Sequence, residues 1–329
     1  MEIRKATLSD LESIYQFNKE QFPEKRVEIK DYIDFWIAKS TSAIDDVILL
    51  VDETDKIVGQ NILSEMSYYY KDEVRTTVWG FDLIVEKEYR KDSWGLELML
   101  FSKSSNPGLM ATGSGPLALA INLKMGMKWL GEIRKYVCIV SPQNLLFSIF
   151  RGNVSINNFP SSVSLNDIKF NRISKDELPD IQKTFNNNLL EISRDKEFLK
   201  WRFYSSLHDY AVYIDAKSES YFVLRTIIQK HITALLLVDY RCDVNKPEQF
   251  QNIISVVKRI ARKLHLSIII TGSTLRDFDN ILEEEHFKSV GRPRPVLGYL
   301  KCKDRKKDID DRNFCFVTLA DSDGETNWV

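Results

Sequence analysis

Residues 81–100 of the chain read FDLIVEKEYRKDSWGLELML, and this stretch decides how the rest of the sequence is interpreted. From residue 79 to residue 85 every second residue is large and apolar, an alternation that predicts a β-strand. A short basic turn over residues 90–95, RKDSWG, interrupts the alternation. The apolar spacing of residues 96–100 then predicts a helix. The stretch is therefore a strand–turn–helix joint.

Such a joint can bind an anion, because the first backbone N–H groups of a helix have no partner within the helix. Arg90 and Lys91 add positive charge to the turn, and Ser93 and Gly95 let a ligand approach the backbone closely. The turn has neither the spacing of a Walker loop nor that of a dinucleotide fingerprint. From the residues alone, two interpretations stay open: a pyrophosphate cradle and a plain structural joint.

Length and composition predict a globular protein of two domains. The chain has 329 residues and a formal net charge of −1, which argues against nucleic acid as the main partner. It starts MEIRK, without an apolar leader, and its longest apolar runs, such as residues 234–238, are too short to span a bilayer. We expect a cytoplasmic protein with no membrane partner.

Cysteine and histidine usage predicts neither disulfides nor a metal site. Cys138, Cys242, Cys302 and Cys315 are widely separated and form no C-x-x-C pair, so buried free thiols are expected. The four histidines form no H-E-x-x-H or similar cluster.

The first half of the chain is expected to contain a strand, two helices, three strands and a helix. The predicted strands cover residues 2–7, 47–51, 57–70 and 74–85, and the helices precede residue 38 or follow residue 95. A buried strand over 108–112, a helix from Pro116 to a stop at Gly126, and a strand or strand pair over 129–140 complete this half.

The second half repeats this order after a linker with one short helix. The predicted strands are 168–173, 210–214, 221–228, 232–240, 266–271, 287–290 and 295–302, and the helices run through 181–185, 195–204, 247–264 and 275–284. The fold class is thus α/β, with an α+β mixed sheet, in a domain over 1–141, a linker over 142–165 and a second domain over 166–329. The turn over 241–247 has no small-residue anion loop, so the second domain is expected not to bind an anion there.

Arg90-x-x-Ser93-x-Gly95 after a strand resembles the acyl-CoA-binding signature of the GNAT acyltransferases, [RQ]-x-x-G-x-[GA], with Ser93 in place of the first glycine. Met125-Gly126-Met127 is similar to the Leu-Gly-Phe of the family's second signature, and Asn122 stands where that signature has tyrosine. The resemblance implies two GNAT-like domains in tandem, with acyl-CoA bound by the first domain and a degenerate second one. The cofactor-binding residues that it implies are Leu83, Val85, Arg90, Lys91, Asp92, Ser93, Trp94, Gly95 and Leu96.

Two further strings, residues 194–202 and residues 316–325 followed by Trp328, are similar to tandem-GNAT proteins of bacterial surface-polysaccharide (O-antigen or capsule) synthesis. The similarity is to sugar N-acyltransferases that act on nucleotide-linked amino sugars. It implies transfer of an acetyl or short hydroxyacyl group, such as 3-hydroxybutanoyl, from acyl-CoA to an amino sugar such as a dTDP-3-amino-3,6-dideoxyhexose. A homodimer is left open.

The expected reaction is direct attack of the amine on the thioester, because no Cys/His or Ser/His pair stands in motif context. Asp82 is the candidate base, if its face of the strand lines the cleft and partial burial raises its pKa. Pairing of Asp82 with a basic neighbour, and a water chain in place of a base, stay open. Asn122 can donate a hydrogen bond but cannot act as an acid. Its alternative is a solvated helix position.

The C-terminal half is expected to supply much of the acceptor site. The candidate substrate-binding residues are Arg194, Trp201, Arg202, Asp321 and Asp323. The arginines suit a diphosphate, the aspartates suit sugar hydroxyls or the amine, and the indole suits stacking on a base. The alternatives are a structural ion-pair network, core packing and a solvated tail. Two other functions also stay open: an aminoacyl-tRNA-dependent peptidyltransferase of the cell-wall type, and a non-catalytic acyl-CoA-binding protein.

Overall fold

A computed structural model describes most of the chain, and the statements below concern the residues it describes. The residues left out are 38–42, 72, 114, 146–151, 153, 166, 180, 182–188, 206, 216, 218–219, 230, 301–313, 323 and 327–329. The predicted helix through 181–185 therefore lies almost entirely outside the described residues.

The chain forms two compact units, each built from more than one segment. Unit 1 consists of Met1–Tyr68, Val74–Leu130 and Pro295–Arg312, and unit 2 consists of Tyr69–Glu73, Gly131–Arg294 and Asn313–Val329. The predicted boundary at residue 141 differs from this division. Strands β6 (Lys128–Ile139) and β14 (Lys288–Leu300) each begin in one unit and end in the other.

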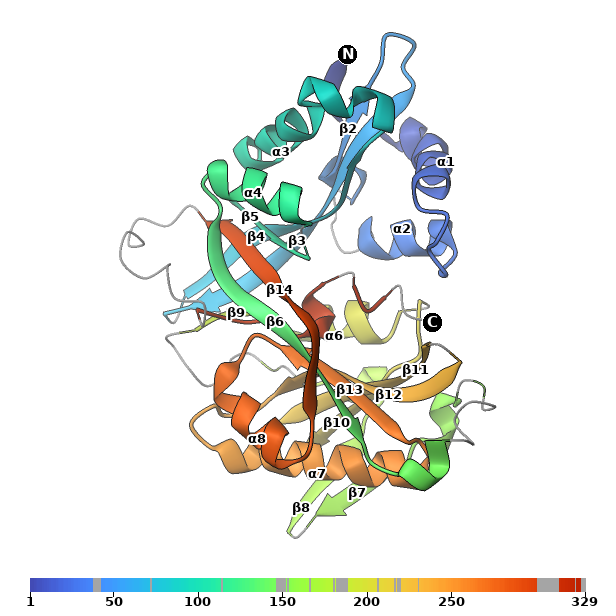
Figure 1. The fold of residues 1–329 in the computed structure, drawn as a ribbon, viewed down its shortest axis with the longest axis vertical. Coiled ribbons are helices and arrows are strands. Elements are labelled where there is room, and N and C mark those ends of the chain that lie inside the picture. The colour runs from blue at the N-terminus through green and yellow to red at the C-terminus, as the bar shows by residue number, and fades with distance from the viewer. Residues whose placement is uncertain are drawn as a thin grey trace. The chain divides into compact units, whose positions relative to one another are not determined.

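Unit 1 is a sheet with helices on both faces (Figure 1). Its further elements are β1 (Glu2–Lys5), α1 (Leu11–Gln21), α2 (Ile29–Ile37), β2 (Val47–Val51), β3 (Ile57–Tyr70), β4 (Glu73–Val85), α3 (Trp94–Ser104), β5 (Gly108–Thr112) and α4 (Pro116–Lys124). The strand order is β1-β2-β3-β4-β5-β14. Strands β4 and β5 are parallel, whereas β1, β2 and β3 and the pair β5 and β14 are antiparallel.

Adjacent polar residues on β3 show which helix covers which face of this sheet. Gln60 exchanges hydrogen bonds of 2.8 Å with Asn18 of α1, whereas Asn61 donates one of 2.8 Å to Ser102 of α3. Successive side chains of a strand point to opposite faces. Helices α1 and α3 therefore pack on opposite faces, with these buried amides paired on each side.

Unit 2 has the strand order β6-β13-β12-β11-β10-β8-β7. Its elements are β7 (Ser162–Leu165), β8 (Ile168–Arg172), β9 (Leu190–Ile192), α6 (Lys196–Phe203), β10 (Ala211–Asp215), β11 (Tyr221–Gln229), β12 (Ile232–Arg241), α7 (Pro247–Lys263), β13 (Ile268–Ser273), α8 (Asp279–Glu284) and β15 (Cys315–Phe316). Strands β12 and β13 are parallel, and the other neighbouring pairs from β6 to β7 are antiparallel.

The two faces of β12 carry different chemistry. Tyr240 packs its ring 4.8 Å from that of Phe250 on α7, in an apolar core. Asp239 and Arg241 point to the other face and are fully buried there. Helix α7 buries Phe250 and other residues at helical spacing, as its amphipathic pattern predicts.

Two differences from the predicted elements have physical reasons. Strand β14 is continuous from Lys288 to Leu300, where the sequence predicts two strands, 287–290 and 295–302. Pro293 and Pro295 lie two residues apart, so the N–H groups that both residues lack are on the same side of the strand. The C-terminal segment is not a solvated tail: residues 314–322 are buried, and β15 pairs in parallel with β9. Strands β9 and β15, of three and two residues, are too short to be recognised from their sequences.

Candidate functional site

The end of β4 is the first part of the candidate site. Strand β4 pairs with β5 only at Val78–Leu109 and Trp79–Met110 among the described residues. Asp82, three residues later, has a φ of 50°, in the left-handed region that L-residues rarely adopt. Beyond this irregularity the backbone of β4 is not paired with β5. The end of β4 is thus splayed away from β5.

The turn after β4 is more ordered than predicted. Residues Lys87–Asp92 form a 3₁₀ helix, and Ser93, with a φ of 63°, precedes the first residue of α3. The Nε of Arg90 donates a hydrogen bond of 2.7 Å to the carbonyl oxygen of Val85. The arginine is therefore held at the strand end.

The first N–H groups of α3 are the second part of the site. Leu96 and Glu97 donate to the carbonyl oxygen of Ser93, at 2.9 and 3.2 Å. Trp94 and Gly95 are the first two residues of α3, and an α-helix offers no intrahelical acceptor to its first N–H groups. A Cβ added at Gly95 would meet only Val85, at 3.9 Å, so the backbone is open there. Unpaired N–H groups at a helix start are an anion-binding arrangement.

The left-handed conformation of Ser93 gives a prediction of its own. Such a conformation costs a non-glycine residue about 1–2 kcal/mol, and glycine loses about 0.5–1 kcal/mol through chain entropy. Ser93→Gly is therefore expected to raise the free energy of unfolding by up to about 1 kcal/mol in urea denaturation. Gly115→Ser is the matched control, because Gly115 has a φ of −63° and open space around it. A lower free energy of unfolding in Ser93→Gly would show that the serine side chain stabilises the fold by more than its left-handed conformation costs.

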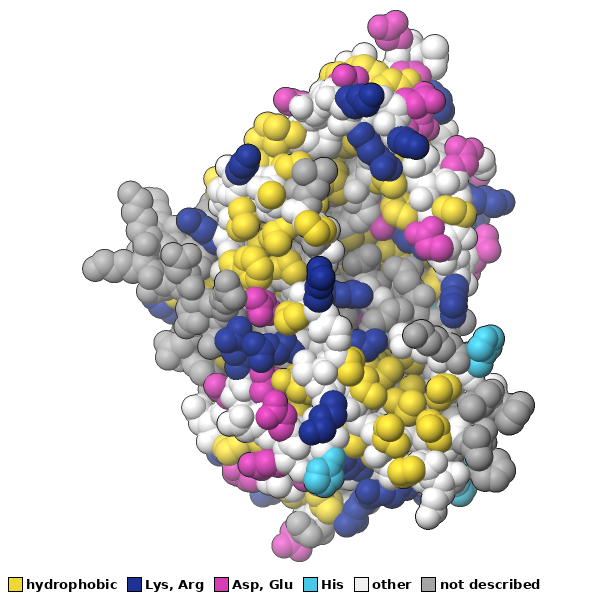
Figure 2. Space-filling view, viewed as in Figure 1, with side chains coloured by type: hydrophobic (Ala, Val, Ile, Leu, Met, Phe, Trp, Pro, Cys, Tyr) yellow, Lys and Arg dark blue, Asp and Glu magenta, His cyan; other side chains and the backbone are white. Residues whose placement is uncertain are grey.

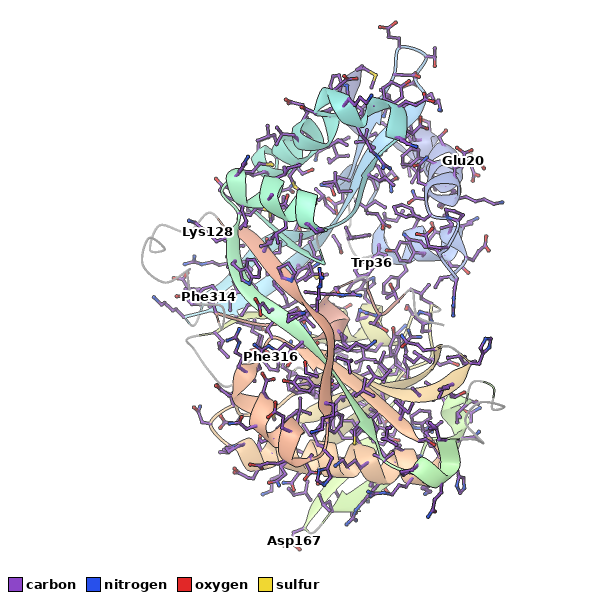
Figure 3. The ribbon with its side chains drawn as sticks, in the orientation of Figure 1. Glu20, Trp36, Lys128, Asp167, Phe314 and Phe316 are labelled. Carbon is purple, nitrogen blue, oxygen red and sulfur yellow. The ribbon has the colours of Figure 1, made fainter. Side chains whose placement is uncertain are left out.

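Asp82 is paired with a lysine. The Nζ of Lys25 lies 2.5 Å from the Oδ2 of Asp82, and both side chains are 6 % exposed. The same ammonium lies over the rings of Phe22 and Tyr32, 4.2 and 3.8 Å from their centroids. Of the two interpretations of Asp82, the structure shows the ion pair. Trp36 of α2 is labelled in Figure 3, and its ring centroid lies 4.5 Å from that of Phe81, the residue before Asp82.

Asn122 lies in the last turn of α4 and is 3 % exposed, so the solvated alternative is wrong. The N–H of Met127 donates to the carbonyl oxygen of Asn122 at 3.0 Å, and Gly126 has a φ of 84°. This is the helix stop that the sequence predicted. Figure 2 shows hydrophobic side chains gathered over α4, where Leu123 is 39 % exposed.

Arg194 and Asp321 belong to a buried ion-pair network in unit 2. Arg194 contacts Asp239 at 2.8 Å and Asp321 at 2.7 Å, and Arg241 contacts Asp239 at 2.8 Å and Glu191 at 2.6 Å. Burial alone would raise the pKa of Asp239, but the two guanidinium charges outweigh it and hold that pKa below its usual range. These side chains have protein partners and are not exposed to a ligand. The structure favours the network interpretation over substrate binding.

Arg202 is likewise buried, beside Glu325. The Glu325 carboxylate accepts hydrogen bonds from Arg202, from Arg225 at 2.9 Å and from Tyr210 at 2.9 Å. Trp201 is half-buried against Phe198, with ring centroids 5.6 Å apart. Asp323 and Trp328 lie outside the described residues.

The sequence reasoning missed Asp239, Arg241, Glu191 and Glu325, which hold these networks together. Glu325 stands within the string that suggested a substrate site, but nothing in that string shows that its partner is an arginine more than 100 residues earlier. Among the described residues, no group of three or more metal-ligating side chains could hold an ion, and no helix is long and apolar enough to cross a membrane.

A polar cavity of about 430 Å³ lies in unit 2, and it gives a pH prediction. His208 lines it, and its Nε2 lies 2.7 Å from the carbonyl oxygen of Thr326. Burial lowers the pKa of His208 to about 4, and the Arg225 charge acts in the same direction. The folded state therefore binds this proton less readily than the unfolded state. The stability that neutral His208 provides is expected to fall as the pH drops from about 6.5 to about 4.

The measurement is urea unfolding of wild type and His208→Gln between pH 7 and pH 4. Wild type is expected to lose about 1–3 kcal/mol more than the variant across this range. The difference isolates His208, because burial raises the pKa of Glu191 to about 7 and gives a slope of opposite sign in both proteins. Parallel pH profiles for the two proteins would contradict the assignment.

No protein-family model and no curated protein sequence matches the chain. Solved structures do. A GCN5-related N-acetyltransferase from Anabaena variabilis has a TM-score of 0.60 and 11 % identity, covering 91 % of this chain and 72 % of its own. A probable N-acyltransferase from Enterococcus faecalis gives the same values. Saccharomyces cerevisiae N-myristoyltransferase with bound myristoyl-CoA has a TM-score of 0.59 and 12 % identity, covering 91 % of this chain and 82 % of its own. The predicted fold class is confirmed: the chain has the GNAT-type acyltransferase fold.

Proposed function

We propose that this chain is an acyl-CoA-dependent N-acyltransferase. The observation that carries the proposal is the end of β4, where a strand that has parted from β5 leads into the first N–H groups of α3, those of Trp94 and Gly95. The fold supports it, because one neighbour of the same fold holds myristoyl-CoA. Acyl-CoA is the cosubstrate, and unit 1 is its proposed binding unit.

In the proposed reaction each part of the strand end has a role. Arg90, Lys91 and the N–H groups of Ser93 to Gly95 hold the pyrophosphate. The backbone of Leu83 to Val85, on the edge of β4 that does not pair with β5, binds pantetheine and polarises the thioester carbonyl. The acceptor amine attacks directly. Asn122 supplies no proton, and a thiol with a pKa of roughly 8–9 leaves without a dedicated acid. Positioning contributes up to about 7–11 kcal/mol in favourable cases.

The proposed acceptor is the amine of a nucleotide-linked amino sugar, and unit 2 is its proposed binding unit. The support is the similarity of residues 194–202 and 316–325 to sugar N-acyltransferases. Because Arg194, Arg202 and Asp321 are buried, their contribution is to shape unit 2 rather than to contact the sugar. The polar cavity beside His208 offers Arg172 and Tyr204 as further polar lining.

The test has two stages. Calorimetric titration with acetyl-CoA, 3-hydroxybutanoyl-CoA and myristoyl-CoA is expected to show binding of at least one. Thiol release is then measured over panels of nucleotide-linked amino sugars and of simple amines. Thiol release with an amino sugar supports the full proposal. Release with simple amines but with no amino sugar supports an acyltransferase and contradicts the amino-sugar acceptor. Binding without release favours an acyl-CoA-binding protein, and the absence of binding contradicts the proposal.

A further inference from the structure

The ammonium group of Lys25 lies in a cage formed by three side chains of unit 1. Lys25 belongs to the segment between α1 and α2 (Figure 1). Its Nζ is 2.5 Å from Asp82 Oδ2 and lies over the rings of Phe22 and Tyr32. A carboxylate with two aromatic faces is the chemistry that recognises an ammonium ion. The cage of Asp82, Phe22 and Tyr32 thus has the chemistry of an amine-binding site, and the amine that occupies it is the protein's own Lys25.

The position of the cage connects it with the thioester. Asp82 lies beyond Trp79, where β4 parts from β5, and three residues before Val85, where Arg90 is anchored. The proposed pyrophosphate site, residues 90–95, follows the C-terminal end of β4. A pantetheine arm that runs from this site along β4 toward the strand's N-terminal end brings its thioester toward Asp82. Lys25 Nζ is a primary amine in contact with that residue.

We infer that Lys25 is an internal acyl acceptor, a self-acylation site of this protein; the inference rests on the proposed function. When acyl-CoA is bound and no external amine is present, the acyl group is transferred to Lys25. The acylated side chain has no charge, so it no longer neutralises Asp82.

The step balances with acyl-CoA as the only co-reactant. Asp82 accepts one proton from the Lys25 ammonium, which leaves a neutral amine with a lone pair. The amine nitrogen attacks the thioester carbonyl carbon, the C–N bond forms, and the C–S bond breaks. The thiolate takes up one proton to give free CoA, and the second proton is released to solvent. The products are an N-acyl-lysine, CoA and one proton.

Exposure separates this reaction from chemical acylation by free acyl-CoA. The Lys25 side chain is 6 % exposed, whereas Lys30, five residues later, is exposed to solvent. A reagent in solution reaches Lys30 first. Preferential acylation of the buried lysine therefore requires acyl-CoA bound beside it.

The experiment incubates the full chain with acetyl-CoA or 3-hydroxybutanoyl-CoA without acceptor and follows both lysines by peptide mass spectrometry. Acylation of Lys25 also blocks tryptic cleavage after it. We expect Lys25 to react at least about tenfold faster than Lys30, at a rate that saturates with acyl-CoA. Asp82→Asn is expected to slow Lys25 at least about tenfold without changing Lys30. In Gly95→Glu, which should no longer bind acyl-CoA, we expect Lys25 to be acylated more slowly than Lys30.

Calorimetry on the same samples distinguishes the possible failures. Acyl-CoA binding with Lys25 no faster than Lys30 would overturn the inference and leave the proposed function standing. Equal slowing of both lysines in Asp82→Asn would do the same. If no acyl-CoA binds, the proposed function fails and the inference fails with it.

Discussion

Gly95→Glu is expected to abolish acyl-CoA binding while unit 1 stays folded. The substitution places a carboxylate beside the N–H groups of Trp94 and Gly95, where the proposal puts the pyrophosphate. Two like charges at this spacing repel, and the side chain fills the space that the ligand needs. We expect affinity to fall at least about 100-fold, or about 3 kcal/mol, by calorimetric titration.

The fold is expected to tolerate this change for two reasons. A Cβ at Gly95 meets only Val85, at an ordinary contact distance of 3.9 Å. An acidic side chain in the first turn of a helix also interacts favourably with the helix dipole. The circular dichroism spectrum and the unfolding midpoint should therefore match those of wild type.

Two controls separate the site from general effects. Gly95→Ala adds the Cβ without charge and should leave affinity within about threefold, since the position is open. Leu100→Glu adds the same charge to α3, at a residue that is 41 % exposed and about 7.5 Å along the helix axis. If Gly95→Glu keeps its affinity for acyl-CoA, or if Leu100→Glu loses as much affinity, the start of α3 is not part of the acyl-CoA site.

Asp239→Asn is expected to destabilise the protein by about 3–5 kcal/mol. Asp239 accepts from Arg194 at 2.8 Å, Arg241 at 2.8 Å, Tyr221 at 2.5 Å and Thr318 at 2.6 Å, at a fully buried position. The amide has almost the same shape but no charge, so two buried guanidinium groups lose their shared counter-ion. Its NH₂ group also faces donors.

The measurement is the urea midpoint, with Glu197→Gln as the control. Glu197 pairs with Lys200 at 2.9 Å, but its side chain is 81 % exposed, so the loss should stay within about 1 kcal/mol. A loss below 1 kcal/mol in Asp239→Asn would show that the network is dispensable. Deletion of the chain after Cys315 is expected to destabilise the protein further. It would remove Asp321 and Glu325, which neutralise buried arginines, and unit 2 would not fold.

The sequence by itself determined the order of the elements and located the strand–turn–helix joint that we propose as the anion site. Apolar alternation located β4, the small residues Ser93 and Gly95 marked the helix start, and Gly126 marked the end of α4. These signals are local: alternation, helix periodicity and positive φ depend on residues within one or two turns of each other. The repetition of this order in the second half also came from local signals.

Only the tertiary structure decided what the charged residues do. Arg194, Arg202 and Asp321 have the composition of a phosphate and sugar site, yet they are buried against Asp239, Glu325 and Arg241. Their partners lie tens to more than 100 residues away, and periodicity contains no information about pairs so distant. Whether an arginine binds a ligand or a buried carboxylate depends on burial and on the partner's position, and both arise when distant segments pack together.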